Sequence, residues 1–370
     1  MQWFFDNLLP EDAARDLLVA SARLPSADAW SLLEIYGAES AGALTLLPPG
    51  VRQQPAALRP LTDEQLQARI EALPRQPLTA LAPKHMSLAG AQQKLPVVLA
   101  ADGLLFEPEG ERASTHILKP NSTSDYYVHS AVNEWFCARL AQEVGLPVPP
   151  VLLRYVPATV YIIERFDRRI TGDAVARLHV LDATQLLSLS SGMKYAENGL
   201  NALAEVIALC RAKAPTRISI FRWVVFNLII GNSDAHLKNL SVFADRDGYS
   251  LTPHYDLVST TAWASPDRVG AGESAWPDVP LSFPIGEASR FSEAKLADVI
   301  GFAKGLGIPQ ATAQRYLDRQ VQAIIPAAEK IYAEYEARTD VPADLRAGQT
   351  RMLRSICHLP ISTMVARLRA

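Results

Sequence analysis

The stretch GNSDAHLKN, residues 231–239, follows an apolar run, FRWVVFNLII, and stops it abruptly. Within it, Asp234 and Asn239 stand as D-x-x-x-x-N, with His236 and Lys238 between them. The preceding run is expected to be helical, so these nine residues should form the loop at its end. A loop needs polar residues but rarely this set, which makes the stretch a candidate functional site.

The spacing of Asp234 and Asn239 is typical of phosphotransferases of the protein-kinase type, because one loop there has two tasks. The aspartate accepts a proton from the attacking hydroxyl or orients it. The asparagine turns back to hold a metal ion on the nucleotide phosphates. For this pair alone, a solvated loop at a helix end remains the better interpretation, since Asp and Asn are common in such loops.

A second candidate metal ligand, Asp256, follows in TPHYDLVS. The intervening DRDG predicts a hairpin turn, and two short antiparallel strands would return Asp256 to the side of Asn239. Carboxylate and amide oxygens from the two ends of one hairpin would suit Mg²⁺. His254, Tyr255 and Asp256 would then stand where protein kinases carry D-F-G. An aspartate that ends a strand is also a routine cap, but the coincidence of Asp234, Asn239 and Asp256 favours the functional interpretation.

Two charged residues upstream could serve the same chemistry. Lys119, in the predicted strand THILKP, is a candidate for binding phosphates, and Glu134, on the helix that follows, could pair with it. The alternatives are a surface lysine at a strand end and an exposed helix glutamate.

The stretch SLAGAQQK, Ser87 to Lys94, is rich in small residues whose backbone could approach phosphates. It holds one glycine, so it is not a G-x-G-x-x-G loop, and alone it would be an ordinary turn. IIERFDRR contains Glu164, Arg165 and Phe166, whose backbone could bind an adenine between two lobes; an edge strand followed by a charged turn is the alternative.

Length, composition, net charge and cysteine content limit the class of protein that this chain can be. The chain has 370 residues, 49% hydrophobic and 20% charged, with a formal net charge of −3, so a folded protein without a global argument for nucleic-acid binding is expected. Its three cysteines lie far apart, against a disulfide framework or zinc site. No apolar run approaches the ~18 residues of a membrane span, and the N-terminus lacks signal-peptide features, so a cytoplasmic protein without membrane contact is expected.

The pattern of apolar and turn residues predicts helices over 1–47, with Ser26 as a cap and Gly37 at an end, and a capping box at Thr62 and Gln65. A Pro-rich connector is predicted over Leu46–Pro60. Further predicted segments are short strands from residue 94 to 120 and from 151 to 169, a helix ending at Gly145, mostly helices over 170–230, little periodicity over 260–290, and helices from 291. We therefore expect a small strand-rich lobe followed by a larger helical lobe.

In combination and order, SLAGAQQK, HILKPN, NEWFCARLAQEVGLPVP, IIERFDRR, MKY, GNSDAHLKN and LTPHYDLVS resemble the HipA family of bacterial toxin kinases. The resemblance spans about residues 3–360, and the run of motifs is far more specific than any one of them. It implies an α+β, two-lobed protein-kinase-like fold with a small antiparallel-sheet N-lobe and a larger helical C-lobe. The implied division is an N-terminal helical module over 1–80, the N-lobe over 81–169 and the C-lobe over 170–370.

The resemblance implies an ATP- and Mg²⁺-dependent protein Ser/Thr kinase, the toxin of a toxin–antitoxin pair restrained by a HipB-like helix-turn-helix antitoxin. Aminoacyl-tRNA synthetases, especially the glutamyl enzyme, are the implied substrates, and their phosphorylation arrests growth and produces persistence. Asp234 would be the catalytic base, Asn239 and Asp256 the Mg²⁺ ligands, and Ser87 the autophosphorylation site. The implied ATP-binding residues are Ala89, Gly90, Ala91, Gln92, Gln93, Lys94, Lys119, Glu164, Arg165, Phe166, His236, Leu237, Lys238, Asn239, Tyr255 and Asp256.

The sequence departs from the family pattern in three places. It begins almost at FFDNLLP, near the end of the family's N-terminal strand-rich module, so the opening strands of that module are expected to be missing. Either the gene is truncated or degenerate, or a separate small protein supplies these strands. The segment after Asp256 lacks the lysine cluster with which some relatives contact operator DNA, so DNA binding is expected only through the antitoxin. AENGLNAL, after MKY, lacks a glycine-rich extension, which could alter substrate docking.

Two alternative functions stay open on the sequence. A small-molecule phosphotransferase would share the D-x-x-x-x-N loop but would give no reason for a serine like Ser87. An inactive co-repressor scaffold is the second alternative, although Asp234, Asn239, Asp256 and Lys119 are all present.

Overall fold

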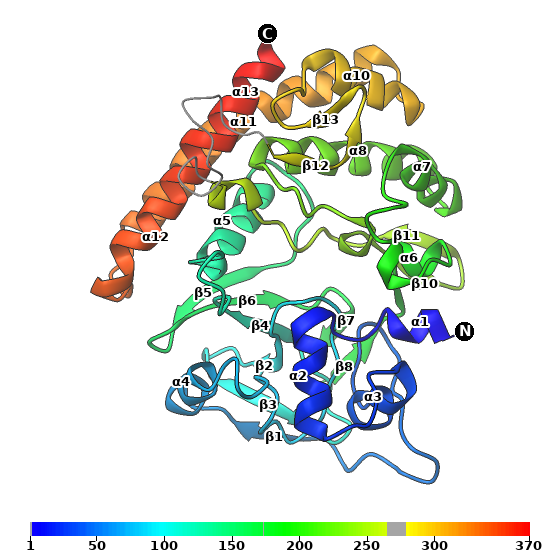
Figure 1. Cartoon of the computed structure of the whole chain (residues 1–370), viewed down its shortest axis with the longest axis vertical. Helices are drawn as coiled ribbons and strands as arrows, with labels where there is room; N and C mark the ends of the chain where they lie inside the picture. The colour runs from blue at the N-terminus through cyan, green and yellow to red at the C-terminus, as the bar shows by residue number, and fades with distance from the viewer. Residues whose placement is uncertain (1, 173, 265–278) are drawn as a thin grey trace. The chain divides into compact units, whose positions relative to one another are not determined.

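The structure of the chain is a computed structural model that describes residues 2–172, 174–264 and 279–370 (Figure 1). It contains two compact units, each assembled from separate stretches of chain. Unit 1 comprises residues 1–131, 149–191 and 243–245, and unit 2 comprises residues 132–148, 192–242 and 246–370. Neither unit is continuous in sequence. The predicted division at residues 80 and 169 stays a prediction.

Unit 1 is built on a six-stranded sheet with the order β1-β3-β2-β4-β6-β5 and antiparallel neighbours throughout. Its strands are β1 (Ala57–Pro60), β2 (Leu95–Leu99), β3 (Leu105–Glu109), β4 (His116–Pro120), β5 (Val151–Tyr155) and β6 (Thr159–Glu164). Buried side chains of β2, β4 and β6, among them Val97, Leu118 and Ile162, form its core. The predicted strands between residues 94 and 169 are thereby confirmed.

Helices border this sheet within unit 1. Helix α4 (Asp63–Glu71) inserts Leu66 into the sheet core and lies beside β1 to β3 in Figure 1. It begins at the predicted capping box, in which Thr62 and Gln65 satisfy each other's backbone N–H groups. Helices α1 (Gln2–Asp6), α2 (Asp12–Ala22) and α3 (Ala29–Tyr36) pack on a separate apolar cluster.

Some local predictions for unit 1 were wrong. Asp28, not Ser26, caps α3, because its carboxylate accepts the Trp30 and Ser31 amides while Ser26 donates to that carboxylate. The Pro-rich connector contains β1, whose Pro60 is tolerated because an edge strand leaves N–H groups unused.

The segment after residue 169 contains strands that were predicted as helix. They are the paired β7 (Arg168–Thr171) and β8 (Ala174–Arg177), with β9 (Val180–Asp182), and only then the short α6 (Ala183–Leu186). Gly172, with φ +57°, allows the turn after β7. The left-handed glycine and β-branched residues such as Ile170 and Val175 favour a hairpin over the predicted helix.

Unit 2 is mainly helical and includes most of α5 (Ser130–Glu143). Its other helices are α7 (Leu200–Leu209), α8 (Lys213–Ile230), α10 (Leu296–Gly305), α11 (Gln310–Glu336), α12 (Ala343–Ile356) and α13 (Ser362–Arg369), with short turns η1 (Ser191–Met193), η2 (Leu237–Asn239), η3 (Thr260–Trp263) and η4 (Cys357–Ile361). Helices α12 and α13 both pack on α11 (Figure 1). The predicted C-terminal helices are confirmed, and α5 is followed at its C-terminal end by Gly145 at φ +75°.

The strands after residue 240 correct the prediction for residues 260–290 and confirm the predicted DRDG hairpin. β12 (Pro280–Ile285) and β13 (Ala288–Arg290) pair within the segment 260–290, where no regular structure was predicted. The part of that segment over 265–278 lies outside the described residues. β10 (Ser241–Asp245) and β11 (Gly248–Leu251) flank the predicted DRDG turn. No helix of the described residues is long and apolar enough to cross a membrane.

Candidate active site

The loop GNSDAHLKN begins where α8 ends, as predicted. Gly231 closes the helix at φ +68°, and a Cβ atom there would lie 1.9 Å from the Thr261 hydroxyl oxygen. Only glycine suits this position, because other residues are strained at this φ and the neighbouring Thr261 leaves no room for a Cβ atom. The buried apolar face of α8 therefore fixes the position at which the polar loop leaves it.

Two asparagines hold the loop in shape. Asn232 accepts the Asp234 amide at 2.9 Å, and its own side-chain nitrogen donates to Asn227 on α8 at 2.8 Å. Asn239 donates its side-chain nitrogen to the Asp234 carbonyl at 2.8 Å. That contact uses the nitrogen end of the Asn239 amide, so the oxygen end is the one that a cation would take. The D-x-x-x-x-N spacing thus corresponds to a loop that the hydrogen bond from the Asn239 side chain to the Asp234 carbonyl closes.

The Asp234 carboxylate has polar neighbours on more than one side. The Tyr195 hydroxyl donates to it, and His236 Nε2 lies 3.8 Å from its Oδ1. The rings of Tyr195 and His236 meet edge to face, with centroids 5.0 Å apart, and Lys194 Nζ lies 5.2 Å from the Tyr195 ring centroid. These contacts orient the carboxylate that was predicted to act as the base.

The pKa of Asp234 is raised above its ordinary value. Although 44% of its side chain is exposed, the surrounding protein displaces much of its water, and this burial is the largest cause of the rise. The Asp256 carboxylate adds to the rise, while His236, the Tyr195 hydroxyl and Lys194 oppose it. The influence of Asp256 indicates that two like charges lie close enough to interact, and a divalent cation would relieve that repulsion.

Asp256 is presented by an irregular segment rather than by the end of a strand, which corrects the prediction. β11 ends at Leu251, and the chain then continues without regular structure to Asp256. Asp256 has φ +56°, in the left-handed region that non-glycine residues rarely occupy. Such a backbone persists when surrounding contacts hold it, and it is frequent at functional sites.

The residues before Asp256 supply those contacts. The Tyr255 hydroxyl donates to the Lys238 carbonyl at 2.7 Å and lies 2.5 Å from the Ser241 hydroxyl, so it connects the Asp256 segment to the loop of Asp234 and Asn239. His254 is buried, donates its amide to the Pro147 carbonyl at 2.7 Å and stacks on Trp223. Burial lowers the pKa of His254 to about 3, so this histidine is neutral and structural.

No group of three or more His, Cys, Asp or Glu side chains in the described ranges is arranged as a metal site. The predicted ligands Asn239 and Asp256 would by themselves be a sparse ligand set. This suits Mg²⁺, which usually takes one or two carboxylates and completes its coordination with water and substrate phosphates.

Two residues of this region were not predicted. Tyr195 belongs to MKY, which was recognised only as a motif and received no role. Asn198 donates its side-chain nitrogen to the Ala235 carbonyl at 3.0 Å, so the segment after MKY supports the loop of Asp234 and Asn239. The sequence offered no local indication of either contact. Of the predicted loop residues, His236, Leu237, Lys238 and Asn239 are all buried. Contact of Leu237 with a ligand would therefore involve its backbone.

Unit 1 holds the remaining predicted residues, beginning with the loop from Ser87 to Lys94. Gly90 has φ +107° and its carbonyl accepts the Glu11 amide at 3.2 Å. Lys94 Nζ donates to the Ala89 carbonyl at 2.5 Å, and Gln92 donates to the Pro120 carbonyl at 3.3 Å. The loop therefore rests on its own lysine and on the end of β4.

Other members of this loop differ in exposure. Ala91 is exposed, Gln93 accepts the Leu78 amide at 3.2 Å, and Ser87 is 0% exposed. Leu88 to Gly90 and Gln92 to Lys94 are half-buried, so the loop is partly accessible.

Lys119 is 5% exposed and pairs with Tyr161 in the β4–β6 ladder, with its Nζ 5.8 Å from the Tyr161 ring centroid. The alternative of a surface lysine is therefore wrong. Glu134 in unit 2 is 4% exposed, so the alternative of an exposed helix glutamate is wrong as well. Lysine and glutamate are rarely buried without a charged partner or ligand, so both side chains belong to the interior and not to the surface. Their predicted mutual pairing stays a prediction.

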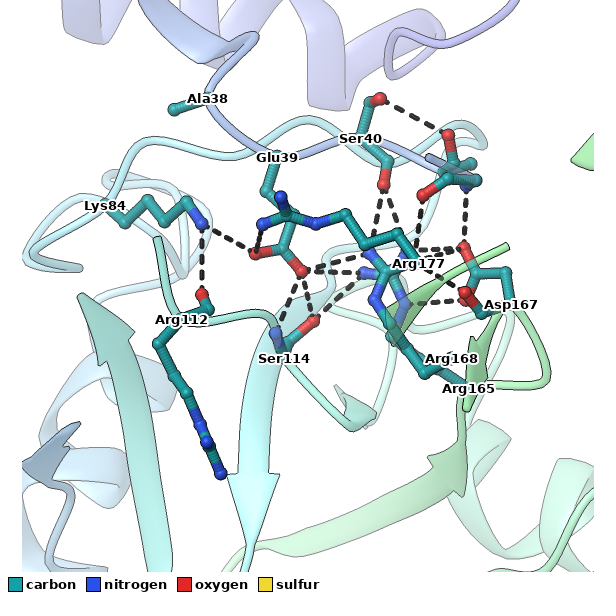
Figure 2. Close-up of polar contacts among 12 residues, drawn as sticks. Ala38, Glu39, Ser40, Lys84, Arg112, Ser114, Arg165, Asp167, Arg168 and Arg177 are labelled. Carbon is teal, nitrogen blue, oxygen red and sulfur yellow. Dashed lines mark hydrogen bonds and ion pairs between the residues drawn. The ribbon is translucent and has the colours of Figure 1, made fainter. Parts of the chain in front are cut away.

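The predicted adenine-binding segment follows β6. The Glu164 amide donates to the Pro150 carbonyl at 3.0 Å and the Arg165 amide to the Thr115 carbonyl at 2.8 Å. The Arg165 side chain is buried in an ion cluster of unit 1 (Figure 2), and the Phe166 ring meets Phe243 edge to face. Arg165 could therefore contact a nucleotide only through its backbone.

Family comparisons agree with this arrangement. Residues 86–328 match the HipA-like C-terminal domain family, and residues 1–47 match the HipA N-terminal domain family. The Sinorhizobium fredii protein Y4mE is 32% identical over 374 residues, covering 95% of this chain and 85% of its own length. The serine/threonine-protein kinase toxin HipA of Shewanella oneidensis is 34% identical over 274 residues, 69% of this chain and 62% of that protein.

A solved structure gives the same result. The HipA chain of a Shewanella oneidensis complex of HipA, HipB and operator DNA has a TM-score of 0.79 and 26% identity, covering 100% of this chain and 85% of that chain. The fold is therefore the predicted α+β, two-lobed protein-kinase-like fold, and the predicted class of enzyme, a protein kinase, is confirmed. The chain belongs to the HipA family.

Proposed function

We propose that this chain is an ATP- and Mg²⁺-dependent protein Ser/Thr kinase that acts as the toxin of a toxin–antitoxin pair. The single observation that carries the proposal is the closed loop of Asp234 and Asn239, with the Asp256 carboxylate close enough to raise the pKa of Asp234. A general base, an amide ligand and a carboxylate ligand are the protein groups that phosphoryl transfer requires.

Asp234 is proposed to accept the proton of the substrate hydroxyl, with Tyr195 and His236 holding its carboxylate in place. Asn239 and Asp256 would hold Mg²⁺, which when bound neutralises charge on the ATP phosphates. The raised pKa brings the Asp234 carboxylate nearer to the range in which proton acceptance is effective.

Lys119 and the backbone of the loop from Ala89 to Lys94 are proposed to bind the ATP phosphates, and the backbone of Glu164 to Phe166 the adenine. The burial of Lys119 supports its part, because a buried ammonium group gains most from a bound anion.

Ser87 is proposed to be the autophosphorylation site. Its side chain is 0% exposed, and its hydroxyl oxygen has no hydrogen-bond partner among the described residues. Phosphate could therefore reach Ser87 only after its segment opens. The phosphoserine, with an added charge of about −1.5 to −2, could not return to the buried position of the serine.

The proposed partners follow the similar complex of HipA with HipB and operator DNA. A HipB-like helix-turn-helix antitoxin would neutralise this chain and provide its contact with DNA. The proposed substrate is an aminoacyl-tRNA synthetase, such as the glutamyl enzyme, whose phosphorylation would arrest growth and produce persistence.

Expression of this chain in a bacterial host, with growth and site-mapped phosphoproteins as readouts, tests the proposal. We expect growth arrest and a phosphorylated synthetase with the unaltered chain, and neither with Asp234→Asn. Asp247→Asn is the matched control, because Asp247 lies after β10 with 85% of its side chain exposed. Growth arrest by the Asp234→Asn variant would contradict a kinase-based toxin.

A further inference from the structure

A buried ion cluster in unit 1 is not explained by phosphoryl transfer. Its central residue is Glu39, in the segment between α3 and β1, with a side chain that is 0% exposed (Figure 2). A buried carboxylate is costly unless it is well paired. The partners of Glu39 therefore show what this residue holds together.

One oxygen of the Glu39 carboxylate faces the segment that leads into the phosphate-binding loop. Glu39 Oε2 accepts Lys84 Nζ at 2.9 Å, and Lys84 also donates to the Arg112 carbonyl at 3.1 Å. The Glu39 backbone carbonyl accepts the Ser87 amide at 3.0 Å. Gly37 and Met86 form an antiparallel bridge next to this contact. The segment 37–39 thus holds residues 84–87 through its backbone and through an ion pair.

The other carboxylate oxygen faces the segment proposed to bind adenine. Glu39 Oε1 accepts the Ser114 amide and hydroxyl at 3.0 and 2.5 Å, and it lies 3.3 Å from Arg165 and 3.2 Å from Arg168. In Figure 2 the carboxylate lies between Lys84 on one side and Ser114, Arg165 and Arg168 on the other.

The charges of the cluster make Glu39 difficult to replace. Its cations are Lys84, Arg165, Arg168 and Arg177, and its carboxylates are Glu39 and Asp167. Burial opposes ionisation of Glu39, but the charges of Arg165, Lys84 and Arg168 outweigh it and hold the pKa of Glu39 well below its usual range. Without this carboxylate the buried cations would face a single carboxylate, Asp167, which does not contact Lys84 in Figure 2.

We propose that Glu39 is a positioning residue for nucleotide binding: it fixes the Lys84–Ser87 segment against the Arg165–Arg168 segment and keeps Ser87 inside the unit. The inference rests on the proposed function, because Lys84–Ser87 leads into the loop proposed to bind the ATP phosphates and Arg165–Arg168 overlaps the segment proposed to bind adenine. It predicts that loss of the Glu39 charge loosens both segments together, so that Ser87 opens more often and ATP binds more weakly.

The first test measures opening without any need for ATP or activity. Ser87→Cys is nearly isosteric, and labelling of the introduced thiol by a maleimide, followed by peptide mass mapping, reports how often the segment opens. Cys357, which is partly exposed, is the internal reference, and Cys137 and Cys210 are buried. We expect the introduced thiol to be labelled at least about tenfold faster when Glu39→Gln is added, the scale of one charge-assisted hydrogen bond.

Glu107→Gln is the matched control. Glu107 is a 1% exposed glutamate of the same unit, paired with Arg59 and Arg69 at 2.7 and 2.6 Å. Its loss should destabilise the sheet without opening residues 84–87. Equal labelling of the introduced thiol in the Glu39→Gln and Glu107→Gln proteins, or no acceleration with Glu39→Gln, would overturn the proposal. If Glu39→Gln does not fold, Lys84→Met removes one of the same contacts and should accelerate labelling by several-fold, and unchanged labelling would overturn the proposal.

The second test is the apparent KM for ATP. The Glu39→Gln protein should show an increase of about tenfold in KM, with kcat at saturating ATP largely kept, because the catalytic loop belongs to unit 2. A fall in kcat with an unchanged KM would contradict a positioning role. If the unaltered chain binds no ATP, the proposed function fails, whereas the labelling ratio still decides whether Glu39 holds the Ser87 segment.

Discussion

Removal of the Tyr195 hydroxyl should slow phosphoryl transfer without weakening ATP binding. Tyr195 donates to the Asp234 carboxylate, and its ring meets His236 edge to face. Tyr195→Phe deletes the hydrogen bond and keeps the ring contact, so the carboxylate loses one orienting partner and gains no new one. The effect should fall on kcat, because the base is used in the transition state and not in nucleotide binding.

The size of this effect follows from the charge and exposure of the pair. A hydrogen bond to a charged group contributes about 1.5–3 kcal/mol when buried. Tyr195 is 47% exposed and the Asp234 side chain 44% exposed, so water replaces much of the contribution. About 1 kcal/mol should remain, which corresponds to a decrease in kcat of roughly five- to tenfold. The loss is far smaller than the ~10²–10⁴-fold that general-base catalysis provides.

Steady-state kinetics with a protein or peptide substrate measures this effect. Tyr316→Phe, on α11, is the matched control, because its ring contacts Arg315 and its hydroxyl has no part in the proposed mechanism. An unchanged kcat in the Tyr195→Phe protein would refute the positioning of Asp234 by Tyr195. An increase in KM for ATP at constant kcat would instead place Tyr195 in nucleotide binding.

Three further predictions concern the metal ligand, the buried lysine and the ion cluster. Asp256→Gly should relieve the strain of the left-handed backbone at φ +56° and raise the melting temperature of the nucleotide-free protein. The same variant should lose the added stabilisation by Mg²⁺ and ATP. A large fall in the melting temperature of the nucleotide-free protein would instead indicate that Asp256 is a structural cap. Lys119→Met should weaken ATP binding at least about tenfold, measured by titration, with little change in far-UV circular dichroism; unchanged affinity would exclude a phosphate contact. The folded-state pKa of Glu39 is depressed, so the stabilisation from its charge is complete above the usual glutamate pKa of ~4.3 and is lost as the pH falls. The difference in unfolding free energy between the unaltered and the Glu39→Gln proteins, measured by urea unfolding, should therefore shrink by up to ~1.4 kcal/mol per pH unit below pH ~4.3. A difference that stays constant with pH would refute the ion pairing.

The sequence allowed the fold class to be predicted because its elements are marked locally. Turn residues separate the short apolar strands, a capping box starts α4 and Gly231 ends α8. The loop of Asp234 and Asn239 is local as well, since its closing hydrogen bond spans five residues. These features depend on residues near one another in the chain, so periodicity and spacing suffice to find them.

The missed features depend on contacts between distant residues. β1 pairs with β3, some fifty residues away, and a Pro-rich segment gives no indication of such a partner. Glu39 lies in the unremarkable stretch AESAG, and its partners Lys84 and Arg168 follow 45 and 129 residues later. Composition likewise could not show that Lys119 and Glu134 are buried, because burial is decided by tertiary packing.

The central claim is that Asp234 serves as the base of a working protein kinase. Intact-mass measurement of the purified chain after incubation with ATP and Mg²⁺, beside the Asp234→Asn variant, tests it most directly. The account predicts a gain of phosphate in the unaltered chain alone, with the modified peptide containing Ser87. Equal phosphate incorporation by the Asp234→Asn variant would contradict the role of Asp234, and a lack of phosphate on both proteins, together with no transfer to any protein substrate, would contradict the proposed kinase activity.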